Sequence, residues 1–542
     1  MKKIIYLFAL MLLTSSCSDL LNLDPEDFTA PETFYRNEKE LDEALMAVYN
    51  PLLQYGLNLS AFMPMGTDEA YSRESSPPSQ PYYYNFDAAN STILDVWKSL
   101  YLGIDRANAL MENADQADCD EAIIKRIKGE ALFLRSYYHF LLVAYWGDVP
   151  LKLKSTKSPK DVHVPRTPAK TIYEQIIKDM ESSVDMVADL SELGYGGKVN
   201  KAAVKGILAR VCLHAAGRLN DASYYPKARS WAWSLIEEAK ANGTYALNPD
   251  YKDVFIKLMQ DKYDIKECLF EVEFWGNTYS NEYRQVNQFT SRFGTNFTLD
   301  YKSENGVSNA RSNAIFQVTP TFYDTFEDGD LRRDWNTYDY SYKSYNTLDK
   351  ATVKPEFKFR LVGKYRREYE INLPVYTWGN STNFPLLRYS DVLLMFAEAD
   401  NEVNGGTTVE SLDAVNQVRR RAFGLDVNTV SAKDVGSMSK TDFLKYIQDE
   451  RLRELAFESH RKLDLIRWGI FLDRMKEVGN TIKAIPEKID GKKNPAIDGI
   501  VFPGLSYVVR TYDNVGTKHL LMPIPELELS VNNAINSNNS EW

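Results

Sequence analysis

The chain has 542 residues, of which 44% are hydrophobic and 26% charged, and its formal net charge is −11. This composition is typical of a water-soluble globular protein, and the length allows several domains or one repeat architecture. The chain is acidic and no Lys/Arg-rich run stands out, which argues against binding to a nucleic-acid phosphate backbone, so no nucleic-acid partner is expected.

The first 16 residues have the form of a secretory signal. Lys2 and Lys3 precede the apolar run from Ile4 to Leu13, and small residues then lead to Cys17. This run is too short to span a bilayer, which needs about 20 apolar residues. The segment resembles a bacterial lipobox, although Leu13 lies one position further from the cysteine than usual. We therefore expect cleavage before Cys17 and lipid attachment to its thiol; the alternative is an ordinary secretory signal with a chance cysteine.

Helical periodicity dominates the first half of the chain after an expected tether over residues 17–39. Apolar residues spaced three and four apart predict helices over residues 40–55, 94–111, 123–146, 168–187, 201–216 and 226–241. Asn200 and Gly217 are suitable as the N-cap and C-cap of the fifth helix. Successive helices of this length predict a scaffold of tetratricopeptide-like helix pairs over residues 40–242.

Residues 243–385 break this pattern. Short β-type runs, such as residues 268–275, alternate there with long stretches rich in Asn, Ser, Tyr and Gly. We expect an irregular, loop-rich region with short strands, and long loops in a compact protein are usually functional. Helices are predicted again over residues 389–403, 411–423 and 440–475, within a segment 386–480 that completes the scaffold, and residues 481–542 are expected to be loop-rich. The predicted fold is thus mainly α, with an irregular ligand-binding portion.

Cysteine and histidine patterns indicate no metal site and no disulfide framework. Cys212 and Cys268 lie in apolar contexts typical of core residues, and Cys119 lies in a polar run. No Cys-x-x-Cys pair and no His-x-x-x-His pair occurs in the sequence. We therefore expect neither a bound metal nor a cofactor.

The sequence also lacks the constellations of the common hydrolases. It contains no Gly-x-Ser-x-Gly elbow and no phosphate-binding loop, and Glu450, Glu454 and Glu458 are spaced four apart on one predicted helix, which does not build a glycosidase cleft. The acidic cluster of Asp324, Glu327, Asp328 and Asp330 is interpreted as a turn or a solvated loop, with calcium binding as the alternative. No catalytic residues are expected.

Five segments in order resemble one known family. They are Leu94–Asn108, Gly129–Arg135 with Tyr145–Pro150, Pro385–Ala399, Glu450–Trp468 and Leu521–Pro525. Together they resemble the signatures of the SusD/RagB family of Bacteroidetes outer-membrane lipoproteins, over nearly the whole chain. Each segment is a weak signal alone, but five in order behind a lipobox are a strong one.

The resemblance implies a helical scaffold that carries an irregular ligand-binding half. It also implies a lipid anchor in the outer membrane, exposure at the cell surface, and a SusC-like TonB-dependent barrel as the partner. The expected function is capture of a glycan ligand and its delivery to that barrel. Two alternatives stay open: a peptide-binding relative of the same fold, and a lid for the transporter that binds no small ligand.

Charged residues recur at helical spacing within the family signatures. They are Arg135, Glu450, Arg451, Glu454, Glu458, Arg461, Asp464 and Arg467. Because they are mixed with apolar residues, we interpret them as ion networks that connect helices rather than as a catalytic site.

Aromatic residues are abundant, with 34 Tyr, 25 Phe and 9 Trp, and many lie in polar segments. A ring with a polar neighbour suits a partly wet surface on which a sugar can stack. The candidate ligand-binding residues fall in three segments: Asp68, Tyr71, Arg73, Tyr83 and Tyr84; Trp275, Asn277, Tyr279 and Tyr283; and Trp335, Tyr338 and Tyr340.

Within these segments we assign provisional roles. Trp275, Trp335 and Tyr338 are expected to stack on sugar faces, while side chains such as Asp68, Arg73 and Asn277 are expected to bind hydroxyl groups. The alternative for each aromatic residue is packing in the core, because large rings are usually mostly buried. Five other tryptophans lie in or beside apolar helices and are expected to be core residues: Trp97, Trp146, Trp231, Trp233 and Trp468.

Overall fold

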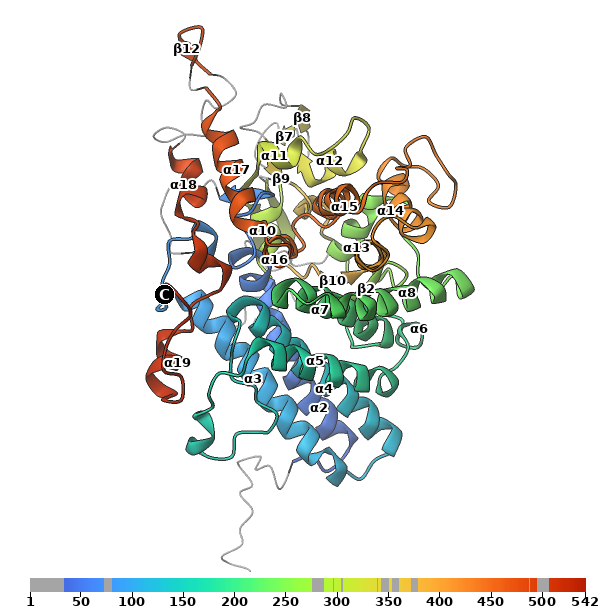
Figure 1. Ribbon diagram of the computed structural model, residues 1–542, viewed down its shortest axis with the longest axis vertical. Coiled ribbons are helices and arrows are strands. Elements are labelled where there is room, and N and C mark those ends of the chain that lie inside the picture. Colours follow the sequence, from blue (N-terminus) through green and yellow to red (C-terminus); the bar gives the residue numbers. More distant parts are fainter. Residues whose placement is uncertain are drawn as a thin grey trace, which may run out of the picture.

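Helices make up most of the computed structural model (Figure 1). The structure describes residues 34–72, 80–274, 287–295, 297–303, 306–338, 340–342, 350–352, 360–371, 379–486, 488–494 and 506–542. No helix in these ranges is both long and apolar enough to cross a bilayer.

The six helices predicted for the first half are all present. They are α2 (Glu38–Tyr49), α3 (Ser91–Asn113), α4 (Glu121–Trp146), α5 (Ala169–Ser183), α7 (Lys201–Leu219) and α8 (Tyr225–Asn242), with the single turn α6 (Leu190–Leu193) between α5 and α7. Sequential helices pack against each other, with α2 to α5 at the lower end of the molecule and α7 and α8 above them, which confirms a helix-pair arrangement (Figure 1).

Several helix ends differ from the prediction, and two of the differences have a clear structural reason. The first helix ends at Tyr49 rather than at residue 55, because Pro51 starts the 3₁₀ turn η2 (Asn50–Gly56), which η3 (Asn58–Phe62) follows. The fifth helix runs past Gly217 and ends before Asn220, which has φ +50°. Gly217 instead allows close packing, because a Cβ there would lie 2.2 Å from the carbonyl oxygen of Arg467. The N-cap prediction is confirmed, since Asn200 accepts a hydrogen bond from the Ala203 amide.

The C-terminal helices pack on this scaffold. They are α13 (Tyr389–Asn404), α14 (Val409–Ala422), α15 (Lys440–Glu454), α16 (Arg461–Arg467) and α17 (Phe471–Lys483). The prediction of one helix over 440–475 was wrong. Phe457 and Ser459 have φ of +63° and +69°, and Gly469 has φ +72°, so the chain leaves the helical conformation between α15 and α16 and again before α17.

The middle region is irregular, as expected, but it contains more regular structure than the sequence indicates. The helix α9 (Tyr251–Met259) was missed; Asp250 caps it and its buried face contains Val254, Phe255 and Leu258. Three short helices also occur, α10 (Phe289–Phe293), α11 (Pro320–Tyr323) and α12 (Leu331–Asn336). The C-terminal segment likewise contains α18 (Ser506–Asn514) and α19 (Glu526–Val531).

Short antiparallel sheets organise the middle region. The strand β2 (Cys268–Val272) pairs with β10 (Phe384–Arg388), and a four-stranded sheet has the order β1 (Ala70–Ser72), β5 (Phe316–Val318), β9 (Leu361–Val362), β6 (Thr337–Tyr338). Hairpins are formed by β3 (Phe297–Ser303) with β4 (Gly306–Ser312), by β7 (Tyr340–Tyr342) with β8 (Lys350–Thr352), and by β11 (Lys488–Ile489) with β12 (Lys492–Lys493).

The four-stranded sheet joins two of the three predicted ligand-binding segments. Tyr71 of β1 pairs with Gln317 of β5, Gln317 pairs with Leu361 of β9, and Leu361 pairs with Tyr338 of β6. Tyr71 and Tyr338 therefore lie in one row at opposite edges, three strand spacings or about 14 Å apart.

A buried ion network connects this sheet region to the helices. Glu454 of α15 accepts hydrogen bonds from Arg388 of β10 at 2.9 Å, from Arg421 of α14 at 2.6 Å and from Arg332 of α12 at 3.2 Å. Burial alone would raise the pKa of Glu454, but these guanidinium groups lower it to about 2. The carboxylate thus stays ionised and links three elements that are distant in sequence.

The predicted charge networks are confirmed in the rest of the scaffold. Arg451 pairs with Asp391 at 2.6 Å and with Asp464 at 2.9 Å, and Arg210 of α7 also pairs with Asp391 at 2.6 Å. The other predicted members are paired as well: Arg135 with Asp179, Glu450 with Arg332, Glu458 with Arg388, Arg461 with Asp68, and Arg467 with Glu398.

Core assignments are confirmed for Cys212, Cys268, Trp97 and Trp146, which are buried. Trp231, Trp233 and Trp468 are partly buried and pack against the same core.

Candidate functional site

An aromatic cluster lies where the four-stranded sheet meets the loops. Its rings come from four elements: Trp335 from α12, Tyr338 from β6, Tyr340 from β7 and Tyr369 from the turn η10 (Arg367–Tyr369). Tyr338 and Tyr340 have ring centroids 5.4 Å apart, and Trp335 and Tyr369 have centroids 5.8 Å apart. We call these four residues the sheet-end cluster; their elements lie at the upper end of the molecule (Figure 1).

Arg366 holds the cluster together. Its guanidinium carbon lies 4.3 Å from the centroid of the Trp335 ring and 5.6 Å from that of Tyr340. The guanidinium donates hydrogen bonds to the carbonyl oxygens of Gly363, Asp334 and Trp335 at 2.8–3.0 Å. The side chain therefore fixes the backbone turn and places a positive charge against two rings.

Glu368 supplies a carboxylate beside the same rings. It accepts hydrogen bonds from the Tyr340 hydroxyl at 3.0 Å and from Lys350 Nζ at 2.7 Å. Burial raises the pKa of Glu368. The ammonium of Lys350 also lies 4.2 Å from the centroid of the Tyr340 ring. Rings, a carboxylate and cations side by side form the kind of surface on which a sugar can stack and form hydrogen bonds.

The accessible rings of the cluster are not the ones that were predicted to stack. Trp335 and Tyr338 are only 5% and 6% exposed, whereas Tyr340 and Tyr369 are half-buried. Gly363 packs against Tyr338, because a Cβ at this glycine would lie 2.9 Å from the ring. Trp335 and Tyr338 are therefore packing residues, and the accessible rings of the cluster are those of Tyr340 and Tyr369. Tyr369 was missed, although it lies in the polar run Arg366–Glu370 that the aromatic criterion could have included.

The described residues of the first predicted segment are buried, which corrects the expectation that they are exposed. Both carboxylate oxygens of Asp68 accept hydrogen bonds from Arg461, at 2.8 and 2.7 Å, and one also accepts from Arg474 at 2.8 Å. Asp68 thus attaches the start of β1 to α16 and α17. Asp68 is fully buried, so a sugar hydroxyl cannot reach this carboxylate.

The tyrosines of this segment are likewise packing residues. Tyr71 is fully buried within β1, and Tyr83 and Tyr84 are almost fully buried. The Tyr83 hydroxyl donates to Ser72 Oγ at 2.9 Å, and the Tyr84 hydroxyl donates to the carbonyl oxygen of Gly66 at 2.8 Å.

Six predicted residues lie outside the described residues: Cys17, Arg73, Trp275, Asn277, Tyr279 and Tyr283. Their roles stay predictions.

Cation–ring pairs near the first and third segments were not predicted. Arg292 of α10 lies 5.8 Å from the half-buried ring of Phe62, which packs against Tyr82 with centroids 5.9 Å apart. Arg360, just before β9, lies 3.6 Å from the half-buried ring of Tyr323. Neither pair has a sequence signal, because the partners are far apart in the chain and meet only through the fold.

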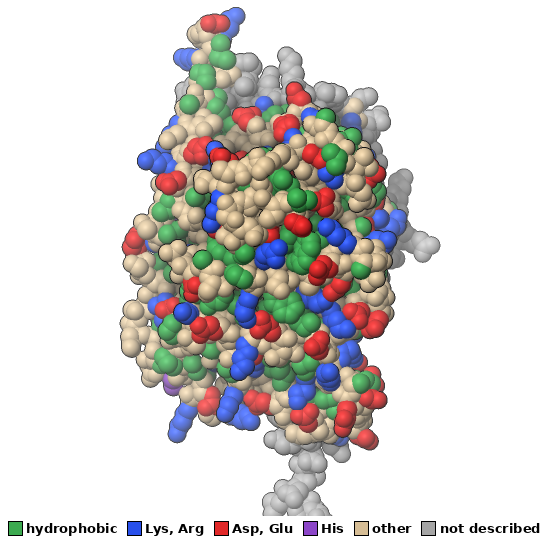
Figure 2. Space-filling model, turned by 45° about the vertical axis from the view of Figure 1, so that its right-hand side comes forward, with side chains coloured by type: hydrophobic (Ala, Val, Ile, Leu, Met, Phe, Trp, Pro, Cys, Tyr) green, Lys and Arg blue, Asp and Glu red, His purple; other side chains and the backbone are tan. Residues whose placement is uncertain are grey.

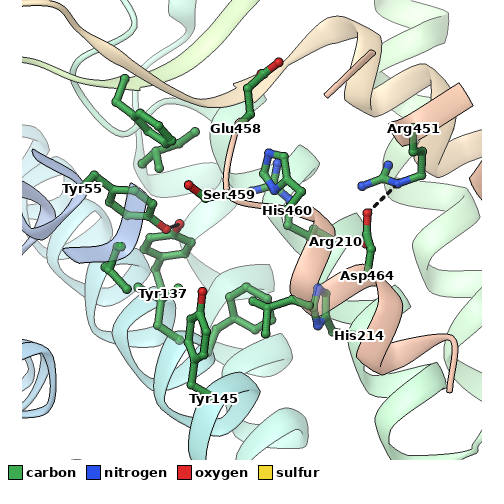
Figure 3. A pocket seen from close by; sticks show the side chains of 16 residues that line it. Tyr55, Tyr137, Tyr145, Arg210, His214, Arg451, Glu458, Ser459, His460 and Asp464 are labelled. Carbon is green, nitrogen blue, oxygen red and sulfur yellow. Dashed lines mark hydrogen bonds and ion pairs between the residues drawn. The ribbon is translucent and has the colours of Figure 1, made fainter. Parts of the chain in front are cut away.

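An internal cavity of about 30 Å³ lies between α4, α7, β10 and α16 (Figure 3). Polar side chains face it, including Tyr137, Tyr145, Arg210, His214 and His460. Its volume fits one or two water molecules and no sugar ring. We therefore assign this cavity to the scaffold and not to ligand binding.

The acidic loop before α12 is used for structural ion pairs. Asp330 accepts from the Arg332 amide and guanidinium, Glu327 pairs with Arg419 at 2.7 Å, and Asp328 lies 3.4 Å from Arg333. The described residues contain no group of three or more His, Cys, Asp or Glu placed to hold a metal ion.

Two models of known protein families match this chain. Residues 266–542 match the family model described as "SusD family", and residues 20–213 match the model described as "Starch-binding associating with outer membrane". A SusD homologue of known structure shares this fold of a helix-pair scaffold and an irregular half with short sheets. The chain belongs to the SusD family, which confirms the resemblance that the sequence motifs indicate.

Individual relatives cover nearly the full length. The chain is 27% identical to SusD-like protein P25 of Formosa agariphila, over 88% of this chain and 91% of that protein. It is also similar to a SusD homolog from Bacteroides thetaiotaomicron of known structure, with a TM-score of 0.81 and 25% identity over 94% of this chain and 98% of that one. A structure titled "Laminarin binding SusD-like protein" shares the fold, with a TM-score of 0.68 and 21% identity over 94% and 100% of the two chains.

Proposed function

We propose that this chain is a cell-surface, glycan-binding lipoprotein of the outer membrane. It captures an oligosaccharide or polysaccharide and delivers it to a SusC-like TonB-dependent barrel. The observation that carries this proposal is membership in the SusD family, together with an N-terminal match to a model described as starch-binding and associating with the outer membrane.

The chemistry of the sheet-end cluster supports the proposal. Tyr340 and Tyr369 offer partly accessible rings, and the exposed Lys350 stands beside them as a hydrogen-bond donor. A pyranose ring presents an apolar face of axial hydrogens and a rim of hydroxyl groups, so it needs both kinds of contact. We assign ligand contact to these residues, together with Trp275, Asn277, Tyr279, Tyr283 and Arg73 from the segments outside the described residues.

We propose a binding role without catalysis. The carboxylates nearest the cluster are committed to other groups: Glu368 to Tyr340 and Lys350, and Glu370 to Arg367 at 3.0 Å. Glycoside hydrolysis needs one carboxylic acid and one carboxylate facing each other across the scissile bond. No such role is assigned to either residue.

Affinity electrophoresis of the chain from residue 18 onward tests the proposal. The gels contain plant, host or microbial polysaccharides, and each polymer is analysed afterwards for shortened products. We expect retardation by a polysaccharide of one class and no cleavage of it. Cleavage of the polymer would contradict the non-catalytic role. The absence of retardation in every gel, with peptide binding in a parallel assay, would contradict the choice of glycan as ligand.

A further inference from the structure

The loop between α4 and α5 is a basic segment of the described surface. Residues 151–160 read Leu-Lys-Leu-Lys-Ser-Thr-Lys-Ser-Pro-Lys and contain four lysines, although the whole chain has a net charge of −11. Lys154, Lys157 and Lys160 are exposed, and Leu153 between Lys152 and Lys154 is 40% exposed. We call residues 151–160 the lysine loop.

The carboxylates near the lysine loop fix its shape, and one of them pairs with Lys157. Glu112 accepts hydrogen bonds from the amide and the hydroxyl of Ser155, at 2.9 and 2.7 Å. Asp161 accepts from the amides of Lys157 and Ser158 at 2.9 and 2.8 Å. Among the described residues only Lys157 of the loop has a carboxylate within ion-pair distance, namely Glu112 at 3.2 Å. The folded loop therefore presents positive charge outward.

The loop borders an open groove of about 940 Å³. Three of the loop's lysines and Leu153 line this groove, and the carboxylates Glu112 and Asp161 line it as well. Leu153 is exposed between two lysines at the edge of the groove. Its side chain can make an apolar contact while the neighbouring ammonium groups bind phosphate groups. This combination suits the interface of a lipid bilayer, where acyl chains lie directly beneath phosphate headgroups.

The lysine loop lies where the N-terminal segment joins the folded body. Asp105 of α3 accepts a hydrogen bond from the Thr156 amide at 2.7 Å. Burial, and then the charge of the same Asp105, raise the pKa of Tyr35, which places that residue close to this carboxylate. The start of α2 and the α4–α5 loop both lie at the lower end of the molecule (Figure 1). Sixteen residues, 18–33, separate the predicted lipid attachment site Cys17 from Phe34.

We propose that the lysine loop docks onto phosphate-bearing lipid headgroups of the membrane that anchors the chain. The lysines bind headgroup phosphates, Leu153 inserts at the interface, and the contact sets the orientation of the body on the membrane. Figure 2 shows Lys and Arg side chains along the lower part of the molecule, with Asp and Glu side chains between them. The role of the lysine loop in the cell rests on the proposed lipid anchor. Binding of the loop to phosphate headgroups does not need the anchor and can be measured without it.

Vesicle co-sedimentation tests the docking without the lipid anchor. The chain from residue 18 onward keeps every described residue and is mixed with vesicles of phosphatidylglycerol and phosphatidylcholine at a ratio of 3:7, or of phosphatidylcholine alone. We expect binding to the anionic vesicles only, and weakening of it as salt rises, because the Debye length falls from about 10 Å at 0.1 M to about 3 Å at 1 M. Equal binding to both vesicles, or to neither, would overturn the proposal.

Matched variants locate the contact. The variant Lys154→Gln/Lys157→Gln/Lys160→Gln is expected to lose at least tenfold in partitioning to anionic vesicles. The control Lys476→Gln/Lys488→Gln/Lys492→Gln removes three exposed lysines from α17 and the β11–β12 hairpin at the upper end, and it should partition like the parent. Equal losses in both variants would show that only net charge matters and would overturn the assignment. The loop variant should still be retarded by the glycan like the parent. Loss of vesicle binding with normal retardation therefore concerns the lysine loop alone and not the proposed glycan binding.

Discussion

At the scale of single residues, the most informative groups are ionisable side chains that the fold buries. Glu69, next to the ion-paired Asp68, accepts hydrogen bonds from the Phe457 amide at 3.1 Å and from the Thr67 hydroxyl at 3.3 Å. Burial, and then the charge of Asp68, raise the pKa of Glu69 to about 8. The folded protein therefore binds a proton at neutral pH that the unfolded chain releases.

This shift predicts a pH dependence of stability. Between about pH 4.5 and pH 8 the unfolded chain has lost the Glu69 proton while the folded chain keeps it, so this residue makes the free energy of unfolding fall as pH rises. Glu69→Gln has the shape of the protonated side chain but cannot ionise. The free energy of unfolding of the variant should therefore decrease less with pH, and the variant should be more stable than the parent at pH 8. Urea unfolding at pH 5, 6.5 and 8 measures the effect. Exposed Glu477→Gln is the control, and a parent-like slope in the Glu69 variant would refute the assignment.

Gly217 provides a second prediction at a single residue. Alanine is favoured over glycine inside a helix by about 1 kcal/mol, so propensity alone predicts that Gly217→Ala stabilises α7. The added Cβ would lie 2.2 Å from the Arg467 carbonyl oxygen, and overpacking of this kind costs about 1–3 kcal/mol. We therefore expect a net loss of stability in chemical denaturation. Gly436→Ala has nothing within 4 Å of the new Cβ and is the control; a more stable Gly217→Ala protein would contradict the packing argument.

At the scale of elements, charged side chains hold the irregular half against the helices. Arg332 precedes the sheet-end cluster on α12, and it pairs with Glu450 at 2.7 Å and with Glu454 at 3.2 Å on α15. Arg388 of β10 pairs with Glu454 and also with Glu458 at 2.7 Å. A buried pair of this kind is weak evidence for stability by itself, but removing one partner leaves an uncompensated charge in the interior.

Glu454→Gln tests the network. The substitution leaves Arg332, Arg388 and Arg421 without a carboxylate that all three contact, and we expect a loss of about 3–5 kcal/mol in the free energy of unfolding. Chemical denaturation followed by circular dichroism measures it. The exposed residue Glu410→Gln should change stability by less than about 0.5 kcal/mol. A Glu454 variant as stable as this control would show that the network does not join the elements.

At the scale of the whole molecule, the sequence predicts the scaffold better than the site. The 3.6-residue periodicity locates all six N-terminal helices, and helical spacing identifies the charge networks, because both signals are local. The break after Glu454 was missed because Phe457 adopts a left-handed conformation that its tertiary surroundings impose, and no local signal marks it.

The site is harder to predict because exposure depends on long-range pairing. Tyr71, Tyr83 and Tyr84 lie in polar sequence, yet strand pairing and neighbouring helices bury them. Trp335 and Tyr338 belong to the right region, while the accessible rings beside them are Tyr340 and Tyr369. Composition locates the segment, and only the fold shows which ring of the segment reaches the surface.

The most direct test of the central claim is the affinity of the Tyr340→Ala/Tyr369→Ala variant for the polysaccharide that retards the parent chain. Each accessible ring contributes about 1 kcal/mol or more to stacking, so the proposal predicts at least tenfold weaker binding with an unchanged circular dichroism spectrum. Tyr263→Ala removes a 41% exposed ring outside the cluster and should bind like the parent. A double variant with parent-like affinity would contradict the assignment of glycan capture to the sheet-end cluster.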